Sequence, residues 1–101
     1  MYQKKAKVQC VESAQGQFII RNARGLHTRP STELVKCAAN FKSLVLLKIH
    51  NTTVNAKSLL GILTLAAVRG TRIRIEAEGE DAEEAVNTIL ELAENNFNTK
   101  Y

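Results

Sequence analysis

The segment that most restricts the fold is residues 71–79, TRIRIEAEG, because apolar residues alternate along it with charged ones. Ile73, Ile75 and Ala77 fall on one side of an extended chain, and the arginines and glutamates fall on the other. A strand of this kind belongs to a sheet that has one covered face and one face in water, which is typical of antiparallel sheets. The other elements should therefore cover a single face of the sheet.

Three more segments have the composition of strands, namely residues 17–21, 44–50 and 52–54. Val45, Leu47 and Ile49 share one face of the second of these. His50 and Asn51 form a two-residue hairpin turn after it, since Asn tolerates a positive φ. Residues 1–16 show no period, and we expect a mobile N-terminal arm there and a single domain over residues 17–101.

Three segments have apolar stripes at helical spacing. The first stripe is Ser31, Leu34, Val35, Ala38 and Phe41. The second helix is expected over residues 56–68, with Asn55 as its N-cap and Gly70 as its stop. The third follows Asp81, which forms a capping pattern with Glu84. Its inner stripe is Ala82, Ala85, Val86, Ile89, Ala93 and Phe97.

The resulting order is βαββαβα. Three helices on one face of a four-stranded antiparallel sheet is the simplest arrangement that buries every stripe. The sequence therefore predicts an α+β fold, an open-faced β-sandwich.

The net charge of +4 conceals an asymmetry along the chain. Residues 1–75 contain 13 of the 14 Lys and Arg but only two acids, Glu12 and Glu33, and residues 76–101 contain the other eight acids. A basic field of this kind attracts anionic partners, and an acidic protein surface fits as well as a nucleic acid. The few aromatic residues do not alternate with the basic ones, so platforms for base stacking are poorly supported.

The location expected from the sequence is the cytosol. The N-terminus MYQKKAKVQC has no apolar core of a signal peptide, and the longest apolar run, LLGILTLAAV, is too short to span a bilayer. Cys10 and Cys37 do not form a disulfide framework.

The stretch ARGLHTRPSTE, residues 23–33, brings reactive groups together at the expected start of a helix. Gly25 allows a turn, and Pro30 suits a first helical turn. His27 then lies near helix N–H groups that favour an anion, and Arg29 adds planar donors that match phosphate oxygens. A neutral imidazole is nucleophilic near pH 7. This pattern fits a residue that carries a phosphoryl group.

Other interpretations of His27 stand beside this one, because a single surface His at a helix start is more often a turn residue without a chemical role. Metal binding has little support, since neither His50 nor Cys37 lies at ligand spacing from His27. The chain also lacks a nucleophile elbow and a Gly-rich phosphate loop with its lysine. We therefore expect no cofactor and no metal, and any phosphoryl group must come from another protein.

Three blocks of the chain, GLHTRP (25–30), VNAKSLLG (54–61) and AEGEDAEEAV (77–86), closely resemble the HPr family. These proteins are the histidine phosphocarriers of the bacterial phosphoenolpyruvate-dependent phosphotransferase system. The resemblance extends over residues 17 to 96 and implies the same open-faced fold. It implies a cytoplasmic carrier protein, modified stoichiometrically, and not an enzyme.

The resemblance also implies a role for several residues. His27 corresponds to the histidine that is phosphorylated on Nδ1 by enzyme I and passes the group to EIIA domains. Arg29 corresponds to the active-site arginine. Ser58 corresponds to a regulatory serine, the target of an HPr kinase/phosphorylase in bacteria that have one, although a serine here also suits a helix cap.

Leu59 and Leu60 correspond to the partner-docking patch of the family. Leu63 is a further candidate for that patch, because the short helix is apolar nearly all round and cannot bury every side. Lys36 is a candidate for its basic rim.

The chain departs from the family pattern at Ser31 and Ala66, where Ala and Gly are common, at the His50-Asn51 turn, and in its longer arm. The nitrogen-regulatory branch of the family remains an alternative. So does a basic module that binds nucleic acid through the arm, Arg72 and Arg74, although the motif matches argue against it. We expect a monomer that binds no nucleic acid and does not insert into membranes.

Overall fold

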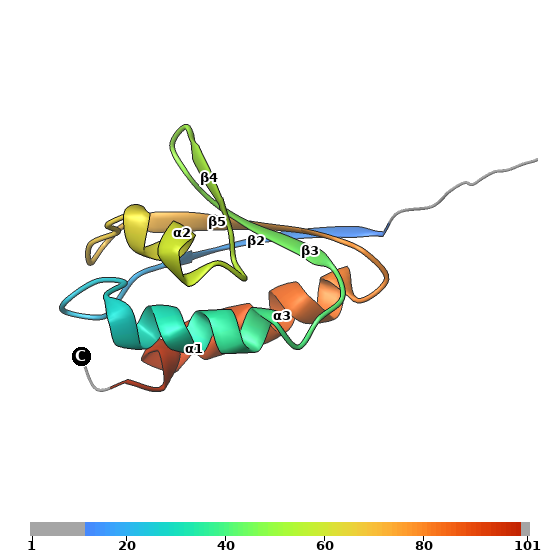
Figure 1. The fold of residues 1–101 in the computed structure, drawn as a ribbon. Helices are drawn as coiled ribbons and strands as arrows, with labels where there is room; N and C mark the ends of the chain where they lie inside the picture. Colours follow the sequence, from blue (N-terminus) through green and yellow to red (C-terminus); the bar gives the residue numbers. More distant parts are fainter. Residues whose placement is uncertain (1–11, 100–101) are drawn as a thin grey trace, which may run out of the picture.

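The computed structural model describes residues 12–99, which form one antiparallel sheet with three α-helices on one face (Figure 1). The order βαββαβα and the open-faced arrangement predicted from the sequence are confirmed. The part of the predicted arm over residues 1–11 lies outside the described residues. The elements are β2 (Ser13–Ile19), α1 (Thr28–Ala38), β3 (Leu44–Ile49), β4 (Thr52–Asn55), α2 (Leu59–Thr64), β5 (Arg72–Glu78), α3 (Ala82–Glu94) and the 3₁₀ segment η1 (Asn96–Asn98).

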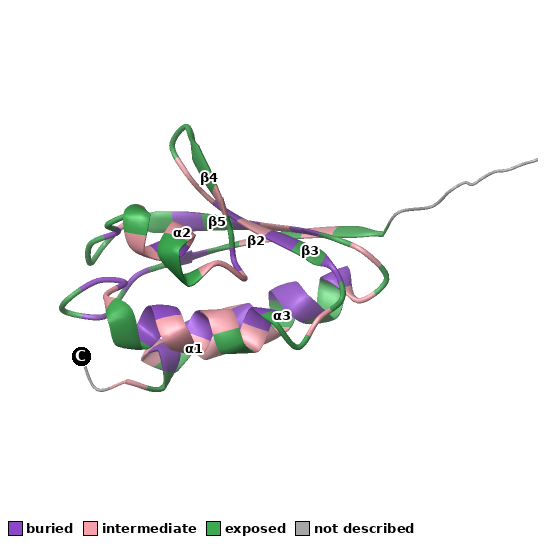
Figure 2. Cartoon of the chain, in the orientation of Figure 1, coloured by how far each residue is buried: buried purple, intermediate pink, exposed green. Residues whose placement is uncertain are grey.

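The strand with strict alternation, β5, lies inside the sheet, whose strand order is β2-β5-β3-β4. Arg74 of β5 is paired with Gln17 on one side and with Lys48 on the other. Buried and exposed residues alternate along β5, as Figure 2 shows, with Ile73, Ile75 and Ala77 buried. One period-2 pattern therefore identified both the strand and the side of the sheet that the helices cover.

The core fills the space between the covered face of the sheet and the helices. It draws on β2, β3, β5 and all three α-helices, and half-buried Val54 of β4 packs against it. Burying one large apolar side chain contributes about 1.5–3 kcal/mol before the entropy of ordering it is counted. Within residues 12–99 no helix is long and apolar enough to cross a bilayer. The fully buried large side chains include Ile20, Leu34, Leu47, Ile62, Ile73, Ile75, Ile89 and Phe97.

The first strand begins earlier than the sequence indicated. Residues 13–16, which we assigned to the arm, belong to β2 and pair with residues 75–78 of β5. The Glu12 carbonyl also accepts a hydrogen bond of 2.8 Å from the N–H of Gly79. These residues are polar or small and have no strand composition, so the partner strand and not local preference determines their conformation.

The second helix is shorter than predicted, and its N-cap is Ser58 rather than Asn55. Asn55 ends β4, and its side chain accepts a 2.8 Å hydrogen bond from the N–H of Lys57. The helix ends at Thr64, and Ala66 then takes a left-handed conformation with φ of 49°. That turn redirects the chain toward β5, so Gly70 is not the helix stop.

The hairpin and the third helix differ in detail from the predictions. The two-residue turn at His50-Asn51 is confirmed, but the residue with positive φ is His50, at 51°. Asp81 is the N-cap residue of α3, but its side chain makes no capping hydrogen bond. It accepts hydrogen bonds from residues 42 and 43 instead. The helix ends at Glu94, and Phe97 lies in η1.

Candidate functional site

His27 is the N-cap residue of α1. Its backbone is extended, with φ of −81° and ψ of −168°, and its side chain makes no capping hydrogen bond. The ring is half-buried, and its Nε2 atom is inaccessible to solvent.

The turn before His27 is held against the segment that follows α2. Gly25 has φ of 71°, and a Cβ at this position would lie 2.3 Å from the carbonyl oxygen of Ala67. Leu26 is 3% exposed, and its N–H donates to that same carbonyl over 2.9 Å. A residue other than glycine at position 25 would meet both a disfavoured φ and a backbone atom, so the tight approach requires glycine.

The first turn of α1 presents backbone donors beside His27. Ser31 is the first residue whose N–H bonds back to the helix start, at 3.1 Å from the His27 carbonyl oxygen. The N–H groups of Thr28 and Arg29 precede it and have no partner within the helix, and Pro30 has no N–H. These donors and the dipole of an 11-residue helix favour an anion at this position.

Arg29 is exposed in this first turn, two residues from His27. Ser31 is fully buried, and its hydroxyl donates to the Leu26 carbonyl oxygen over 3.1 Å. The serine that departs from the family pattern thus ties the helix to the turn before His27. His27 and Arg29 therefore lie together at the start of α1, and the roles of nucleophile and phosphate-binding cation stay predictions.

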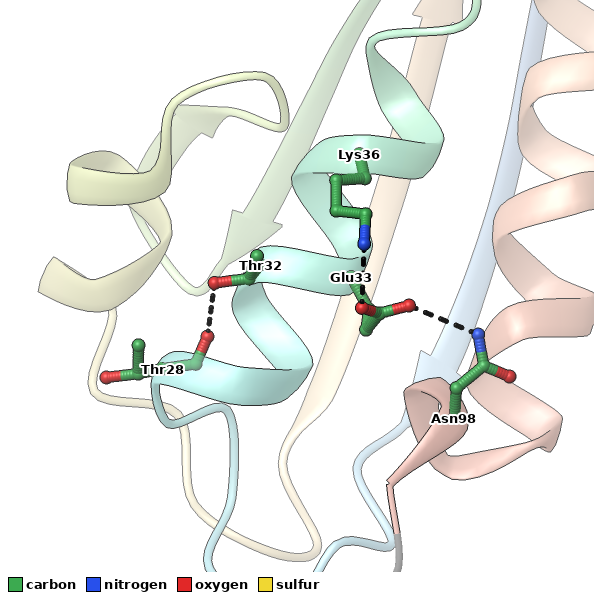
Figure 3. Close-up of polar contacts among 5 residues, drawn as sticks. All are labelled: Thr28, Thr32, Glu33, Lys36 and Asn98. Carbon is green, nitrogen blue, oxygen red and sulfur yellow. Dashed lines mark hydrogen bonds and ion pairs between the residues drawn. The ribbon is translucent and has the colours of Figure 1, made fainter.

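The exposed side of α1 carries a small polar network, shown in Figure 3. The Glu33 carboxylate lies 3.3 Å from the Lys36 ammonium and accepts a 3.3 Å hydrogen bond from the Asn98 amide. Hydrogen bonds from Asn98 and then Lys36 lower the pKa of Glu33 below its usual value. Lys36 is therefore an ion-pair partner of Glu33, although its side chain remains 68% exposed and accessible to other molecules.

The predicted docking residues differ in how far they are exposed to solvent. Leu60 is 74% exposed and Leu59 is 36% exposed, so both reach the surface of α2. Leu63 is half-buried, and the residue before it, Ile62, belongs to the core. Helices α1 and α2 contact each other, which places this apolar surface beside the helix that begins at His27.

Ser58 has a structural function in the fold. As the N-cap of α2, its hydroxyl oxygen accepts a 3.0 Å hydrogen bond from the N–H of Gly61. The side chain is half-buried. A cap and a modification site are compatible, since a hydroxyl at a helix start serves both.

Two residues near the site were not predicted. Val68 is 65% exposed and follows Ala67, whose carbonyl holds the Gly25 turn, so it adds to the apolar surface near His27. Asn22 is 2% exposed at the start of the loop that leads to His27. The only local signal for Asn22 was its place two residues after the apolar run FII. Among residues 12–99, no three His, Cys, Asp or Glu side chains are grouped to hold a metal ion.

The chain is similar in sequence to known proteins over most of its length, including the loop that contains His27. The family model described as "PTS HPr component phosphorylation site" matches residues 14–95. The phosphocarrier protein HPr of Xylella fastidiosa (strain 9a5c) is 42% identical over 82 residues, which is 81% of this chain and 92% of the relative. That of Buchnera aphidicola subsp. Schizaphis graminum is 44% identical over 78 residues, or 77% of this chain and 92% of the relative.

Solved structures agree with the architecture. The crystal structure of HPr-C-His from Thermoanaerobacter tengcongensis has a TM-score of 0.82 at 35% identity, and the match covers 87% of this chain and 99% of that one. A phosphocarrier protein HPr from Bacillus anthracis str. Ames has a TM-score of 0.72 at 36% identity, covering 76% and 92%. The family match over residues 14–95 includes the loop and helix that carry His27 and Arg29.

Proposed function

The chain belongs to the HPr family and is a phosphocarrier of the phosphotransferase system, a phosphoryl carrier rather than a catalyst, and we propose that His27 is the residue that carries the group. The observation that supports this most directly is the position of His27 at the N-terminus of α1, with Nε2 buried. Nδ1 is then the acceptor nitrogen. Family membership implies phosphotransferase-system partners, enzyme I and EIIA.

The chemistry at this position is a displacement at phosphorus. The lone pair of neutral Nδ1 attacks the phosphoryl group on enzyme I, a phosphorus–nitrogen bond forms, and the bond to the donor breaks. The Thr28 and Arg29 N–H groups and the Arg29 guanidinium meet the oxygens of the group as it arrives. The group then leaves by the reverse displacement on an EIIA acceptor.

We propose that the partners dock on the apolar surface formed by Leu59, Leu60 and Val68, with Leu63 below it and Lys36 at its rim. Its large side chains are exposed beside the helix that begins at His27, and exposed apolar patches mark interaction sites. Basic side chains near it favour an acidic partner surface and faster encounter. In this proposal the same surface serves donor and acceptor in turn.

We further propose Ser58 as a regulatory phosphorylation site where the host has an HPr kinase/phosphorylase. Its position directly before Leu59 would place a dianionic phosphate at the docking surface.

The sugar-uptake and nitrogen-regulatory branches of the family share the transfer of a phosphoryl group through a histidine, and we propose the sugar-uptake branch. The expectations of a cytoplasmic location, a monomer and no nucleic-acid binding stay predictions.

The deciding experiment incubates the protein with enzyme I and labelled phosphoenolpyruvate. We expect an acid-labile, base-stable phosphoryl group on the wild type and none on His27→Ala. His50→Ala is the matched control, because His50 is the other histidine of the chain and lies in the exposed β3–β4 turn. It should label fully. Label that persists in a folded His27→Ala protein would overturn the assignment.

A further inference from the structure

The last described residues of the chain include a turn with an unusual backbone conformation, Asn96–Asn98. Asn96, Phe97 and Asn98 are all left-handed, with φ of 54°, 56° and 60°. This conformation costs Phe97 about 1–2 kcal/mol and the two asparagines less, so the turn requires contacts that hold it. Phe97 supplies one, because it is 1% exposed and packs edge-to-face on Phe18 with ring centres 5.6 Å apart. The turn also contacts α1.

Asn22 joins this C-terminal turn to the loop before His27. Its amide nitrogen donates to the Asn96 carbonyl oxygen at 2.9 Å and to the Thr99 hydroxyl at 2.7 Å. The Thr99 hydroxyl in turn donates to the Asn96 carbonyl over 2.7 Å. The three groups form a closed set of hydrogen bonds around a buried amide, which is where such bonds contribute most.

The backbone of Asn22 transmits this anchor toward His27. The Asn22 carbonyl accepts a 2.9 Å hydrogen bond from the N–H of Gly25, which closes the turn, and the next N–H, that of Leu26, bonds to Ala67. His27 follows directly. The loop is thus fixed at its start by residues 96–99, in its middle by Ala67, and at its end by α1.

We propose that the C-terminal turn, residues 96–99, is a positioning element for His27 that acts through Asn22. This inference rests on the proposed function of His27 as phosphoryl acceptor. Without the Asn22 anchor the loop has more conformations, and Nδ1 spends less time in line with the incoming phosphorus. The docking surface on α2 has no contact with Asn22 in this network, so association should not change.

The test compares three variants. Thr99→Val removes one of the two acceptors of the Asn22 amide nitrogen at nearly constant volume, and Thr99→Ser keeps that hydroxyl. Thr88→Val is the matched control, because Thr88 makes a comparable 2.8 Å hydrogen bond to Glu84 within α3, away from the loop. Each variant is assayed as the substrate of enzyme I at a temperature where circular dichroism shows it folded. Amide hydrogen exchange is measured at Gly25 and Leu26.

We expect Thr99→Val to lower kcat roughly 3- to 10-fold, less than the roughly 100-fold that a displacement of about 1 Å can cause. KM should stay within about twofold, and the Gly25 and Leu26 amides should exchange faster. Thr99→Ser and Thr88→Val should behave like the wild type. Asn22→Ala removes the donor of the same hydrogen bonds and should have the same effect on kcat and on amide exchange as Thr99→Val.

Wild-type kcat and exchange rates in folded Thr99→Val and Asn22→Ala proteins would overturn the proposal. An equal loss of kcat in Thr88→Val would do so too, since it would indicate general destabilisation. Failure of the proposed function looks different: label would then remain on a His27→Ala protein. The exchange rates still test the anchor in that case, because they do not depend on phosphoryl transfer.

Discussion

At the residue scale, Arg29 is the side chain other than His27 whose loss should slow phosphoryl transfer most. Its guanidinium is exposed in the first turn of α1 and, in the proposed mechanism, meets charge on the moving phosphoryl group. Arg29→Ala should lower the maximal transfer rate from enzyme I by roughly 100-fold and change KM less. Arg29→Lys should recover part of the rate, since an ammonium lacks the planar fork. Rapid-quench kinetics measure both parameters.

The control for Arg29 is Arg74→Ala, which removes an exposed arginine from the open face of the sheet. It should leave the maximal rate unchanged. Equal losses in Arg29→Ala and Arg74→Ala would show that total positive charge matters and would remove the special position assigned to Arg29.

Ala66 has a backbone conformation that is unfavourable for any residue with a Cβ atom. It is exposed and has φ of 49°, where a Cβ is unfavourable. Ala66→Gly should raise the free energy of unfolding by about 0.5–1 kcal/mol, because relief of the strain exceeds the added freedom of the unfolded chain. Urea denaturation measures the change.

Ala39→Gly provides the opposite case for comparison. Ala39 is also exposed, but its φ of −66° and ψ of −17° are helical. Glycine there should lower the free energy of unfolding by about 0.5–1 kcal/mol. A loss of stability in both glycine variants would mean that Ala66 is not strained.

At the scale of elements, the sequence predicted what periodicity controls. The alternation of β5 and the stripe of α1 identified a strand, a helix and their buried faces, because burial imposes those periods. Where a polar side chain finds its partner far along the chain, no local pattern exists. The Asp81 carboxylate was predicted as a cap and instead binds the loop before β3, and the partners of Asn22 lie 74 and 77 residues away.

The ends of several helices and strands were predicted wrongly, because they too depend on residues far along the chain. β2 begins at Ser13 because β5 pairs with it, and α2 begins at Ser58 because Asn55 is needed at the end of β4. At the site, the grouping of His27 with Arg29 was visible locally. The hold of Ala67 on the Gly25 turn depends on two segments that only the fold brings together.

Ser58 provides a test of one element, α2. Because its hydroxyl oxygen caps the Gly61 N–H, Ser58→Ala should lower the free energy of unfolding by about 0.5–2 kcal/mol. Ser58→Asp keeps a capping oxygen and should retain stability. It should instead raise the KM for enzyme I, since its charge lies beside Leu59 and Leu60 of the proposed docking surface. Thermal melts and transfer kinetics measure the two effects separately.

Ser58→Asn is the neutral control, because asparagine caps a helix without adding charge. It should match the wild type in both stability and KM. If Ser58→Asp leaves KM unchanged, or if it unfolds the domain, Ser58 is a cap without a regulatory role in this protein.

At the scale of the whole molecule, Asp81 links the two halves of the chain. Its carboxylate accepts hydrogen bonds from the Ser43 hydroxyl, from the Lys42 N–H at 2.8 Å and from the Ser43 N–H at 2.9 Å. These bonds, that of the Ser43 hydroxyl first, lower the pKa of Asp81 below its usual value. The loop before β3 and the turn before α3 are therefore joined by an ionised group.

This link should make stability depend on pH. Because the folded-state pKa lies below the unfolded one, the contribution is complete above about pH 4 and is lost as the pH falls through the folded-state pKa. Asp81→Asn should be less stable than the wild type at neutral pH, and the gap should narrow in acid. Urea denaturation from about pH 7 to about pH 2.5 measures it.

Glu83→Gln is the control for the acid titration. Glu83 is exposed in the first turn of α3, so its removal should shift stability little and should not reproduce the narrowing gap. A gap between the wild type and Asp81→Asn that stays constant down to the lowest pH would contradict the assignment.

The long reach of the Asn22 anchor has a consequence for synthesis on the ribosome. Translation at about 5–20 residues per second leaves roughly 4–15 seconds between Asn22 and Asn96, which lies 74 residues later. During that interval the nascent chain already contains His27 but lacks the residues that fix its loop. In the proposed mechanism the phosphoryl acceptor is made early and its anchor later, so a chain cut short of Thr99 would carry His27 without the hydrogen bonds that residues 96–99 make to Asn22.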